Sequence, residues 1–366
     1  MSPLLALADC LRRRHPEVEI TALGTAAGLE SRLVPARGYR LETMPKVVFP
    51  RRPGTDVFSL PGRLGGAVRA ADRVVAGADV VVGFGGYVAS PAYLAARRRG
   101  IPIVVHEQNA RPGLANKLGA RLTRHVGVTF DSTPLPHAQV VGMPLRREIA
   151  DLDRSAVREP ARESFGLDPH TPTLLVTGGS LGAKRLNDAF AVAAPQIRAA
   201  GVQVLHLCGR GKEFPPPIGE GPAYVVREYA DRMELAYAAA DLVVARSGAN
   251  TVCELTAVGL PAVYVPLPIG NGEQRVNATD VVGAGGGLLI DDTDLTPARI
   301  LSDVMPLITD ADRVRDMAAA AASCGRRDAD EMLTDMVERA VAQGDGDDRP
   351  AVHHALRPRR RRAARP

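Results

Sequence analysis

The amino-acid sequence predicts an α/β protein built from two doubly wound domains that face each other across a cleft. Both halves alternate short apolar runs, typical of buried parallel strands, with amphipathic helical segments. In each half a glycine-rich turn follows a strand-like run and precedes a helix, at residues 83–86 and 178–182. A polar, irregular stretch separates the halves, so we place a linker and the start of the second domain at residues 146–170.

The first domain, residues 1–145, is predicted to open with a helix at Ser2-Pro3 that ends in basic residues. A strand at residues 101–105 leads into the polar run His106-Glu107-Gln108-Asn109. Ligands of open α/β sheets bind at the carboxyl ends of the strands. We therefore favour a functional role for this run over a capping or loop role.

The second domain, residues 171–342, repeats the pattern with strand-like runs at 173–177, 202–207, 225–229, 242–245 and 262–265. Its glycine loop resembles a phosphate loop but lacks the GxxxxGK[ST] spacing, which disfavours a nucleotide-triphosphate motor. Residues 343–366 form a basic tail for which we expect disorder.

The segment Asp241–Pro266 reads as strand, turn, helix and strand. Asn250 and Thr251 are predicted to cap the helix, and Glu254 is placed in its first turn. The free amides at such a helix start favour a phosphate, and a carboxylate one turn further can accept hydrogen bonds from a ribose. From the segment alone, a nucleotide-sugar site and a plain βαβ crossover are equally good interpretations.

Composition and charge exclude several classes of protein. The 366 residues are 45% hydrophobic and 24% charged, without a transmembrane-length apolar run or a signal-peptide pattern. Seven arginines and three aspartates follow residue 342, so the tail carries most of the net charge of +5 and the body does not suggest nucleic-acid binding. The tail is either a solvated segment or an attachment to anionic lipid or nucleic acid. The cysteines, without a CxxC pair, indicate a reduced, cytosolic protein without a zinc or disulfide framework; they are Cys10, Cys208, Cys253 and Cys324.

The motifs of several enzyme classes are missing from the sequence. There is no GxGxxG with a following acidic residue, no HExxH, no EF-hand loop and no GxSxG. No DxD stands at a strand end where it would hold a metal–diphosphate. If a nucleoside diphosphate leaves here, helix N-termini and a cation such as Arg146 are expected to stabilise its charge.

Six sequence blocks together resemble a known family: VGFGGYVASPAYLAA, HEQNARPGLANKL, VGMPLR, VTGGSLGAKRLN, EYADRMELAYAAADLVVARSGANTVCEL and GLPAVYVPLPIGNGEQRVNA. In order and spacing they are similar to the lipid I N-acetylglucosaminyltransferases of peptidoglycan synthesis, in glycosyltransferase family 28. The resemblance implies a GT-B fold of two Rossmann-like domains and an inverting transfer without a metal or a tightly bound cofactor. The 4-hydroxyl of the N-acetylmuramoyl unit of lipid I attacks C1 of UDP-N-acetylglucosamine (UDP-GlcNAc), UDP leaves, and lipid II forms.

The resemblance also implies the roles of individual residues. Glu254 would hold the ribose hydroxyls, and Ser180 and Arg146 would contact the diphosphate. Further implied donor contacts are the amides of Ala249, Asn250 and Thr251, the uracil-reading backbone at Tyr229 and Ala230, and the sugar-binding side chains Asn109 and Gln274. The implied acceptor side comprises Gly85, Gly86 and Tyr87, with His106 and Glu107 as candidate catalytic residues.

Because lipid I is anchored in a bilayer, the resemblance implies a peripheral protein on the cytoplasmic face of the plasma membrane. Cell-division or elongation proteins are further expected partners, and nucleic acid is not. The cluster Lys46-Val47-Val48-Phe49 with Arg51 and Arg52 is apolar and basic. It is either a patch that touches an anionic membrane surface or a partly buried loop.

The family pattern begins with a strand and a GGTxGH loop directly before the Ser2-Pro3 helix, whereas the given sequence begins at Met1. We therefore expect unpaired strand edges in the first sheet, lower stability and poor activity for this chain. Two alternatives to the leading function stay open. One is a transferase of the same fold with another acceptor, and the other is a non-catalytic UDP-sugar-binding protein.

Overall fold

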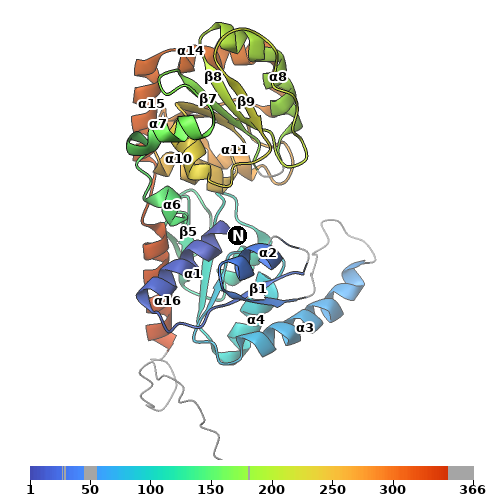
Figure 1. The fold of residues 1–366 in the computed structure, drawn as a ribbon. Helices are drawn as coiled ribbons and strands as arrows, with labels where there is room; N and C mark the ends of the chain where they lie inside the picture. The colour runs from blue at the N-terminus through green and yellow to red at the C-terminus, as the bar shows by residue number, and fades with distance from the viewer. Residues whose placement is uncertain (27, 29, 45–55, 180–181, 345–366) are drawn as a thin grey trace, which may run out of the picture.

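The computed structural model describes residues 1–26, 28, 30–44, 56–179 and 182–344, without the side chains of residues 56–61. The chain forms two lobes, the first from its N-terminal half and the second from its C-terminal half. The last helix returns to the first lobe (Figure 1). The Lys46–Arg52 cluster and residues 345–366 of the basic tail lie outside the described residues. No described helix combines the length and the apolar character needed to cross a bilayer.

The strands of the first lobe form two parallel sheets, one of β1 and β2 and one in the order β3-β4-β5-β6. Within the described residues β1 and β3 are not hydrogen-bonded to each other, so these strands do not make one continuous sheet. The elements are α1 Ser2–Arg14, β1 Thr21–Gly24, α2 Glu30–Ala36, β2 Arg40–Thr43, α3 Asp56–Val75, β3 Val81–Gly83, α4 Ala89–Arg99, β4 Ile103–Glu107, α5 Leu114–Gly119, β5 His125–Val128 and β6 Ala138–Val140.

The second lobe is a six-stranded parallel sheet in the order β12-β11-β10-β7-β8-β9. This is a doubly wound order whose direction reverses between β7 and β10, where such folds bind ligands. The elements that build and cover it are α7 Arg154–Ser164, β7 Thr173–Thr177, α8 Lys184–Ala199, β8 Gln203–Leu207, β9 Tyr224–Arg227, α9 Met233–Ala239, β10 Leu242–Ala245, α10 Ala249–Ala257, β11 Ala262–Tyr264, α11 Glu273–Asn277, α12 Thr279–Gly283, β12 Gly287–Leu289, α14 Met305–Ile308 and α15 Ala311–Ser323.

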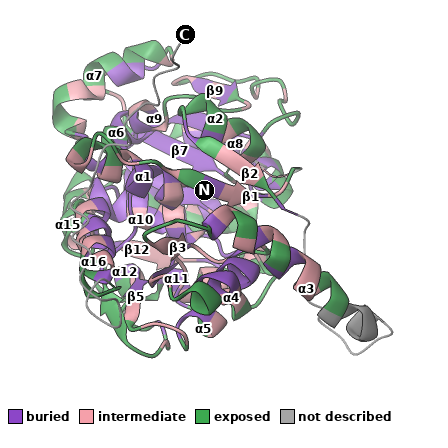
Figure 2. Cartoon of the chain, turned by 90° about the horizontal axis from the view of Figure 1, so that it is seen from below, coloured by how far each residue is buried: buried purple, intermediate pink, exposed green. Residues whose placement is uncertain are grey.

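The strands of the second lobe read as continuous apolar runs because both faces of the sheet are covered. Leu242 and Val244 join the apolar cluster beneath α8, whereas Val243 and Ala245 join the cluster that contains α9 and α10. The four side chains have no exposed surface, and Figure 2 shows β7 as buried. The alternation is the two-residue period of a pleated strand.

The segment predicted to be irregular after Arg146 is instead largely helical, forming α6 (Arg147–Ala150) and α7. Asp153 caps α7, since its Oδ1 accepts from the amides of Ser155 and Ala156 at 3.0 and 3.2 Å. Arginines recur every fourth residue on α7, and Arg162 donates to the Ala239 carbonyl (2.9 Å) and to Asp241 (2.7 Å). The sequence does not predict this helix by apolar periodicity, because its inward face carries Arg162 among only a few apolar residues, Val157 and Ala161.

The carboxyl-terminal helix α16, Ala329–Gly344, packs against α1, β4 and β5 of the first lobe. Ion pairs fasten it there: Arg13 lies 3.0 Å from Asp330, and Arg14 lies 2.6 Å from Asp335. Figure 1 shows α16 running beside this lobe. The chain therefore crosses between the lobes twice, once before α7 and once before α16.

Candidate active site

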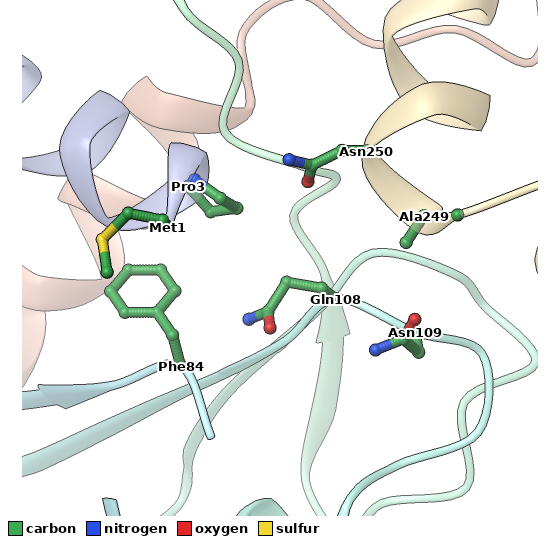
Figure 3. Close-up of a pocket in the computed structure, with 8 residues that line it drawn as sticks. Met1, Pro3, Phe84, Gln108, Asn109, Ala249 and Asn250 are labelled. Carbon is green, nitrogen blue, oxygen red and sulfur yellow. The ribbon is translucent and has the colours of Figure 1, made fainter. Parts of the chain in front are cut away.

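A cavity of about 320 Å³ lies between the two lobes and is lined from both. Figure 3 shows the first-lobe loop with Gln108 and Asn109 on one side and the start of α10 on the other. The lining residues are Met1, Pro3, Phe84, Gln108, Asn109, Gly248, Ala249 and Asn250. Among the residues predicted from sequence, Asn109, Ala249 and Asn250 therefore meet at one cavity.

The predicted functional run His106–Asn109 divides into two structural and two cavity-lining residues. Strand β4 continues to Glu107, so His106 and Glu107 are strand residues rather than loop residues. Consecutive strand side chains point to opposite faces, and these two are covered on both sides, with 0% and 2% exposure. Gln108 and Asn109 follow the strand and line the cavity.

His106 does not have the geometry of a general base. Its Nε2 donates to the Gly142 carbonyl at 2.8 Å, and its Nδ1 accepts from Gln108 Nε2 at 3.1 Å. Burial lowers the pKa of His106 to about 4, despite the opposing effect of the Gly142 bond, so the ring is neutral near pH 7. With both ring nitrogens engaged, His106 fits a structural role, joining β4 to the segment that carries Arg146.

Glu107 holds the loop that follows it. Its Oε1 accepts from the amide of Asn109 at 3.0 Å, and its Oε2 accepts from the amide of Gly113 and from Asn116 Nδ2, both at 3.0 Å. Asn116 is held in turn by the Tyr93 hydroxyl at 2.9 Å. These donors engage both carboxylate oxygens, so Glu107 fixes the position of Asn109; the catalytic role expected for Glu107 stays a prediction.

The glycine turn of the first lobe follows β3. Gly85 and Gly86 both have φ of +80°, which favours glycine, and a Cβ on Gly85 would lie 3.2 Å from Asn116 Nδ2. Phe84, rather than either glycine, lines the cavity, and Tyr87 is 43% exposed. The turn thus packs closely behind the Glu107 network and presents an aromatic ring to the cleft.

Helix α10 begins at the cavity without a side-chain cap. Its N-cap is Gly248, so the prediction that Asn250 and Thr251 cap it was wrong, and both lie inside its first turn. The Ser247 hydroxyl is buried and has no hydrogen-bond partner among the described residues. Free helix amides beside an unpaired hydroxyl form an anion-binding surface.

Glu254 is in the second turn of α10 rather than the first. Its Oε2 accepts from the Tyr237 hydroxyl at 2.8 Å, and Oε1 accepts no hydrogen bond from the described residues. Burial raises the pKa of this carboxyl, opposed by the Tyr237 bond and by the charge of Arg146. Within the described residues the Arg146 guanidinium makes no hydrogen bond and no ion pair, which leaves this partly buried cation available to a ligand.

Tyr229, Ala230 and Gln274, also predicted as donor contacts, are not among the residues that line the cavity. Tyr229 follows β9, is 40% exposed and has the Arg210 guanidinium 5.0 Å above its ring, while Ala230 is buried. Gln274 uses its Oε1 to accept from the Leu267 amide at 3.0 Å. Ser180 lies outside the described residues.

Asn277 is a central residue that the sequence pattern does not predict. Its Oδ1 accepts from the amide of Ala110 at 2.9 Å, and its Nδ2 donates to Asn109 Oδ1 and the Ser247 carbonyl, each at 3.3 Å. It is 1% exposed and joins the first-lobe loop to the turn before α10. Its partners are distant in sequence. The available sequence signal is its position three residues after Gln274, a predicted sugar-binding residue.

A group of possible metal ligands in the described part of the chain lies away from the cleft, between α1 and α16. It comprises Cys10, Asp330 and Glu331. Arg13 lies 3.0 Å from both carboxylates, and burial raises the pKa of Cys10 to about 11. Arginine therefore already balances the charge of these groups.

Comparison with known proteins gives consistent matches along the chain. Residues 1–128 match the glycosyltransferase family 28 N-terminal domain, and residues 173–333 match the family 28 C-terminal domain. A Streptomyces avermitilis protein named UDP-N-acetylglucosamine–N-acetylmuramyl-(pentapeptide) pyrophosphoryl-undecaprenol N-acetylglucosamine transferase is 56% identical over 346 residues, 93% of this chain and 95% of that protein. A Nocardioides protein of the same name is 58% identical over 341 residues, 92% of this chain and 93% of that protein. The crystal structure of Acinetobacter baumannii MurG superposes with a TM-score of 0.74 at 29% identity, covering 92% of this chain and 95% of that one.

Proposed function

The chain belongs to glycosyltransferase family 28, and we propose from this membership that it transfers N-acetylglucosamine from UDP-GlcNAc to lipid I, forming lipid II of peptidoglycan synthesis. The observation that carries the proposal is the 56% identity to the named Streptomyces transferase over 93% of the chain. The family resemblance and the GT-B fold predicted from the sequence blocks are confirmed by the same matches. UDP-GlcNAc is the donor substrate, and no tightly bound cofactor is required.

For the donor site, the uncapped start of α10 supports binding of the diphosphate by the amides of Ala249, Asn250 and Thr251. Ser180 would complete this contact together with the Arg146 guanidinium, which has no hydrogen bond or ion pair within the described residues. As the glycosidic bond to UDP breaks, negative charge grows on the leaving phosphate, and preorganised amides and a cation stabilise it. The free Oε1 of Glu254 is suited to the ribose, and the backbone at Tyr229 and Ala230 would read uracil.

For the sugar, Asn109 is held on both sides of its amide, by Glu107 at 3.4 Å and Asn277 at 3.3 Å. A fixed carboxamide at the cavity is suited to hydrogen-bonding the N-acetylglucosamine hydroxyls. Gln274 would be the second side chain that binds these hydroxyls. The acceptor would approach from the first lobe, past Tyr87. The 4-hydroxyl of its N-acetylmuramoyl unit then attacks C1 from the face opposite the leaving UDP, which inverts that centre.

The direct test is transfer of radiolabelled N-acetylglucosamine from UDP-GlcNAc to a short-chain lipid I analogue by the purified protein. A disaccharide-linked lipid product is expected. Transfer to small aglycones but not to the lipid I analogue would show a different acceptor. Binding of UDP-GlcNAc without any transfer would show a non-catalytic sugar-nucleotide-binding protein.

We further infer that the protein attaches peripherally to the cytoplasmic face of the plasma membrane through Lys46–Arg52. The support is the apolar-basic sequence of this cluster and the lipid anchor of the acceptor. Co-sedimentation with phosphatidylglycerol vesicles is expected at low salt, weakened by the K46E/R51E/R52E variant and by added salt. Vesicle binding that is unchanged in this variant and at high salt would contradict the assignment of Lys46–Arg52 as the membrane contact.

A further inference from the structure

One acidic side chain in the second lobe joins two segments that lead to the donor cleft. Asp292 lies in the short 3-10 turn Asp292–Asp294, after β12, and its side chain is 11% exposed. Its Oδ2 accepts from Arg185 Nε at 3.0 Å, and its Oδ1 lies 2.7 Å from Arg246 Nη1. Asp292 is outside the cavity lining and outside the sequence blocks of the family.

Its two arginine partners stand at corresponding points of the fold. Arg185 is the second residue of α8, just after the glycine loop that follows β7. Arg246 directly follows β10 and precedes the Ser247-Gly248 turn that opens α10. Strands β7 and β10 are neighbours at the reversal of the sheet, so one carboxylate bridges the starts of both helices there.

Arg246 depends on this carboxylate for charge balance. Its Nη1 donates to the carbonyls of Val265 and Pro266 at 3.1 and 3.3 Å, so Asp292 Oδ1 meets it as an ion pair without hydrogen-bond geometry. The Nε of Arg246 has no partner among the described residues, and the side chain is 12% exposed. Among the described residues Asp292 is the carboxylate paired with Arg246, and removing this opposite charge from a partly buried cation displaces or destabilises it.

We propose that Asp292 is a positioning residue for the diphosphate of the donor nucleotide. This proposal rests on the proposed function. It makes no contact with the phosphates. Through Arg185 and Arg246 it fixes the separation of the α8 and α10 starts, whose backbone amides receive the two phosphoryl groups. The proposal therefore predicts a selective effect. Loss of Asp292 weakens the binding of a nucleoside diphosphate and leaves the binding of the nucleoside unchanged.

The test compares UDP with uridine on the full chain. Asp292→Asn is expected to raise the Kd of UDP, measured by calorimetry, about tenfold, the effect of one lost charge-assisted contact. The Kd of uridine, measured by ligand-observed NMR, stays unchanged. Asp294→Asn, on the same turn but exposed, should leave both constants unchanged. Equal weakening of UDP and uridine would indicate a merely structural role and overturn the proposal, as would an unchanged UDP Kd.

Arg185→Met provides a variant that keeps the fold, since this side chain is 47% exposed. It should weaken UDP binding less than Asp292→Asn, and the double variant should lose less than the sum of the two. Strict additivity would show that the two side chains do not act together and overturn the bridge. If the unsubstituted chain does not bind UDP, the proposed function itself fails; if it binds UDP and the variants match it, only the positioning role fails.

Discussion

Replacing Glu254 tests the ribose assignment at a residue whose surroundings are well defined. The carboxylate is 9% exposed, with Oε2 held by the Tyr237 hydroxyl at 2.8 Å and Oε1 without a partner in the described chain. Glu254→Ala removes both oxygens. Glu254→Gln keeps the size and an acceptor for Tyr237 but removes the charge.

The magnitude follows from the strength of a hydrogen bond to a charged acceptor. Such a bond contributes about 1.5–3 kcal/mol, which corresponds to roughly 10- to 100-fold in affinity. Glu254→Ala should therefore raise the KM for UDP-GlcNAc by at least about tenfold. Glu254→Gln should have a smaller effect, because a neutral acceptor makes a bond about half as strong.

The assay that isolates the ribose is competition by UDP and by 2′-deoxy-UDP in the transfer reaction. The unsubstituted protein should prefer UDP, and Glu254→Ala should lose that preference. Asp330→Asn is a matched control, because it also neutralises a buried carboxylate but lies on α16, away from the donor cavity. A preference for UDP that survives in Glu254→Ala would refute the ribose contact, whatever happens to KM.

The same residue makes a prediction about pH. Because burial raises the folded-state pKa of Glu254 above its unfolded value, its stabilising contribution is complete below the unfolded pKa and is lost as pH rises through the folded pKa. Glu254→Gln should consequently be more resistant to urea than the unsubstituted protein at about pH 7.5, with the difference vanishing at acidic pH. The donor KM of the unsubstituted protein should rise as pH falls through that pKa, and the KM of Glu254→Gln should not.

Three further substitutions test the supporting contacts. Asn277→Ala should raise the donor KM about fivefold, since it removes hydrogen bonds of about 1 kcal/mol each; initial rates with Asn109→Ala and the double variant should show non-additive losses. His106→Phe should lower the free energy of unfolding by about 1–3 kcal/mol, yet leave the shape of the pH profile of kcat/KM between about pH 6 and 9 as it is in the unsubstituted protein, because the pKa of His106 is about 4; loss of an acidic limb of the profile in this variant would instead identify His106 as the base. Arg162→Met should cost about 3–5 kcal/mol in urea unfolding, whereas Arg147→Met, at an exposed pair, should cost little.

The second lobe was predictable because its elements carry local signals. The runs at Leu242–Ala245 and Thr173–Thr177 are apolar throughout, as buried parallel strands must be, and both strands have those bounds in the structure. Helix α7 has a weaker signal, since its inward face has few apolar residues, Val157 and Ala161, beside Arg162, whose partners are distant carbonyls and Asp241. Hydrophobic periodicity is weak in a helix that packs partly through guanidinium groups.

The sequence predicts which residues belong to the candidate site, but not which of them line the cavity and which hold the others in place. His106 and Glu107 look like reactive groups in the sequence, yet their partners, Gly142 and Asn116, come from other parts of the lobe and occupy their polar atoms. Asn277 looks ordinary, yet it bonds Ala110 across 167 positions of sequence. Such roles are set by long-range contacts, which a pattern of neighbouring residues does not contain.

The two ends of helix α10 differ in their partners, and this difference links these observations. At its carboxyl end, Arg327 donates to the Ala257 carbonyl at 2.7 Å and Arg154 donates to the Gly259 carbonyl at 2.8 Å, which balances the negative end of the helix dipole. Its amino end has no side-chain cap and opens on the cavity, so its positive end is left for a ligand. Arg154 and Arg327 belong to the two chain crossovers between the lobes, and Arg327 also donates to the Leu152 carbonyl at 3.1 Å. Residues of both crossovers therefore hold the carboxyl end of the helix whose amino end lines the cavity.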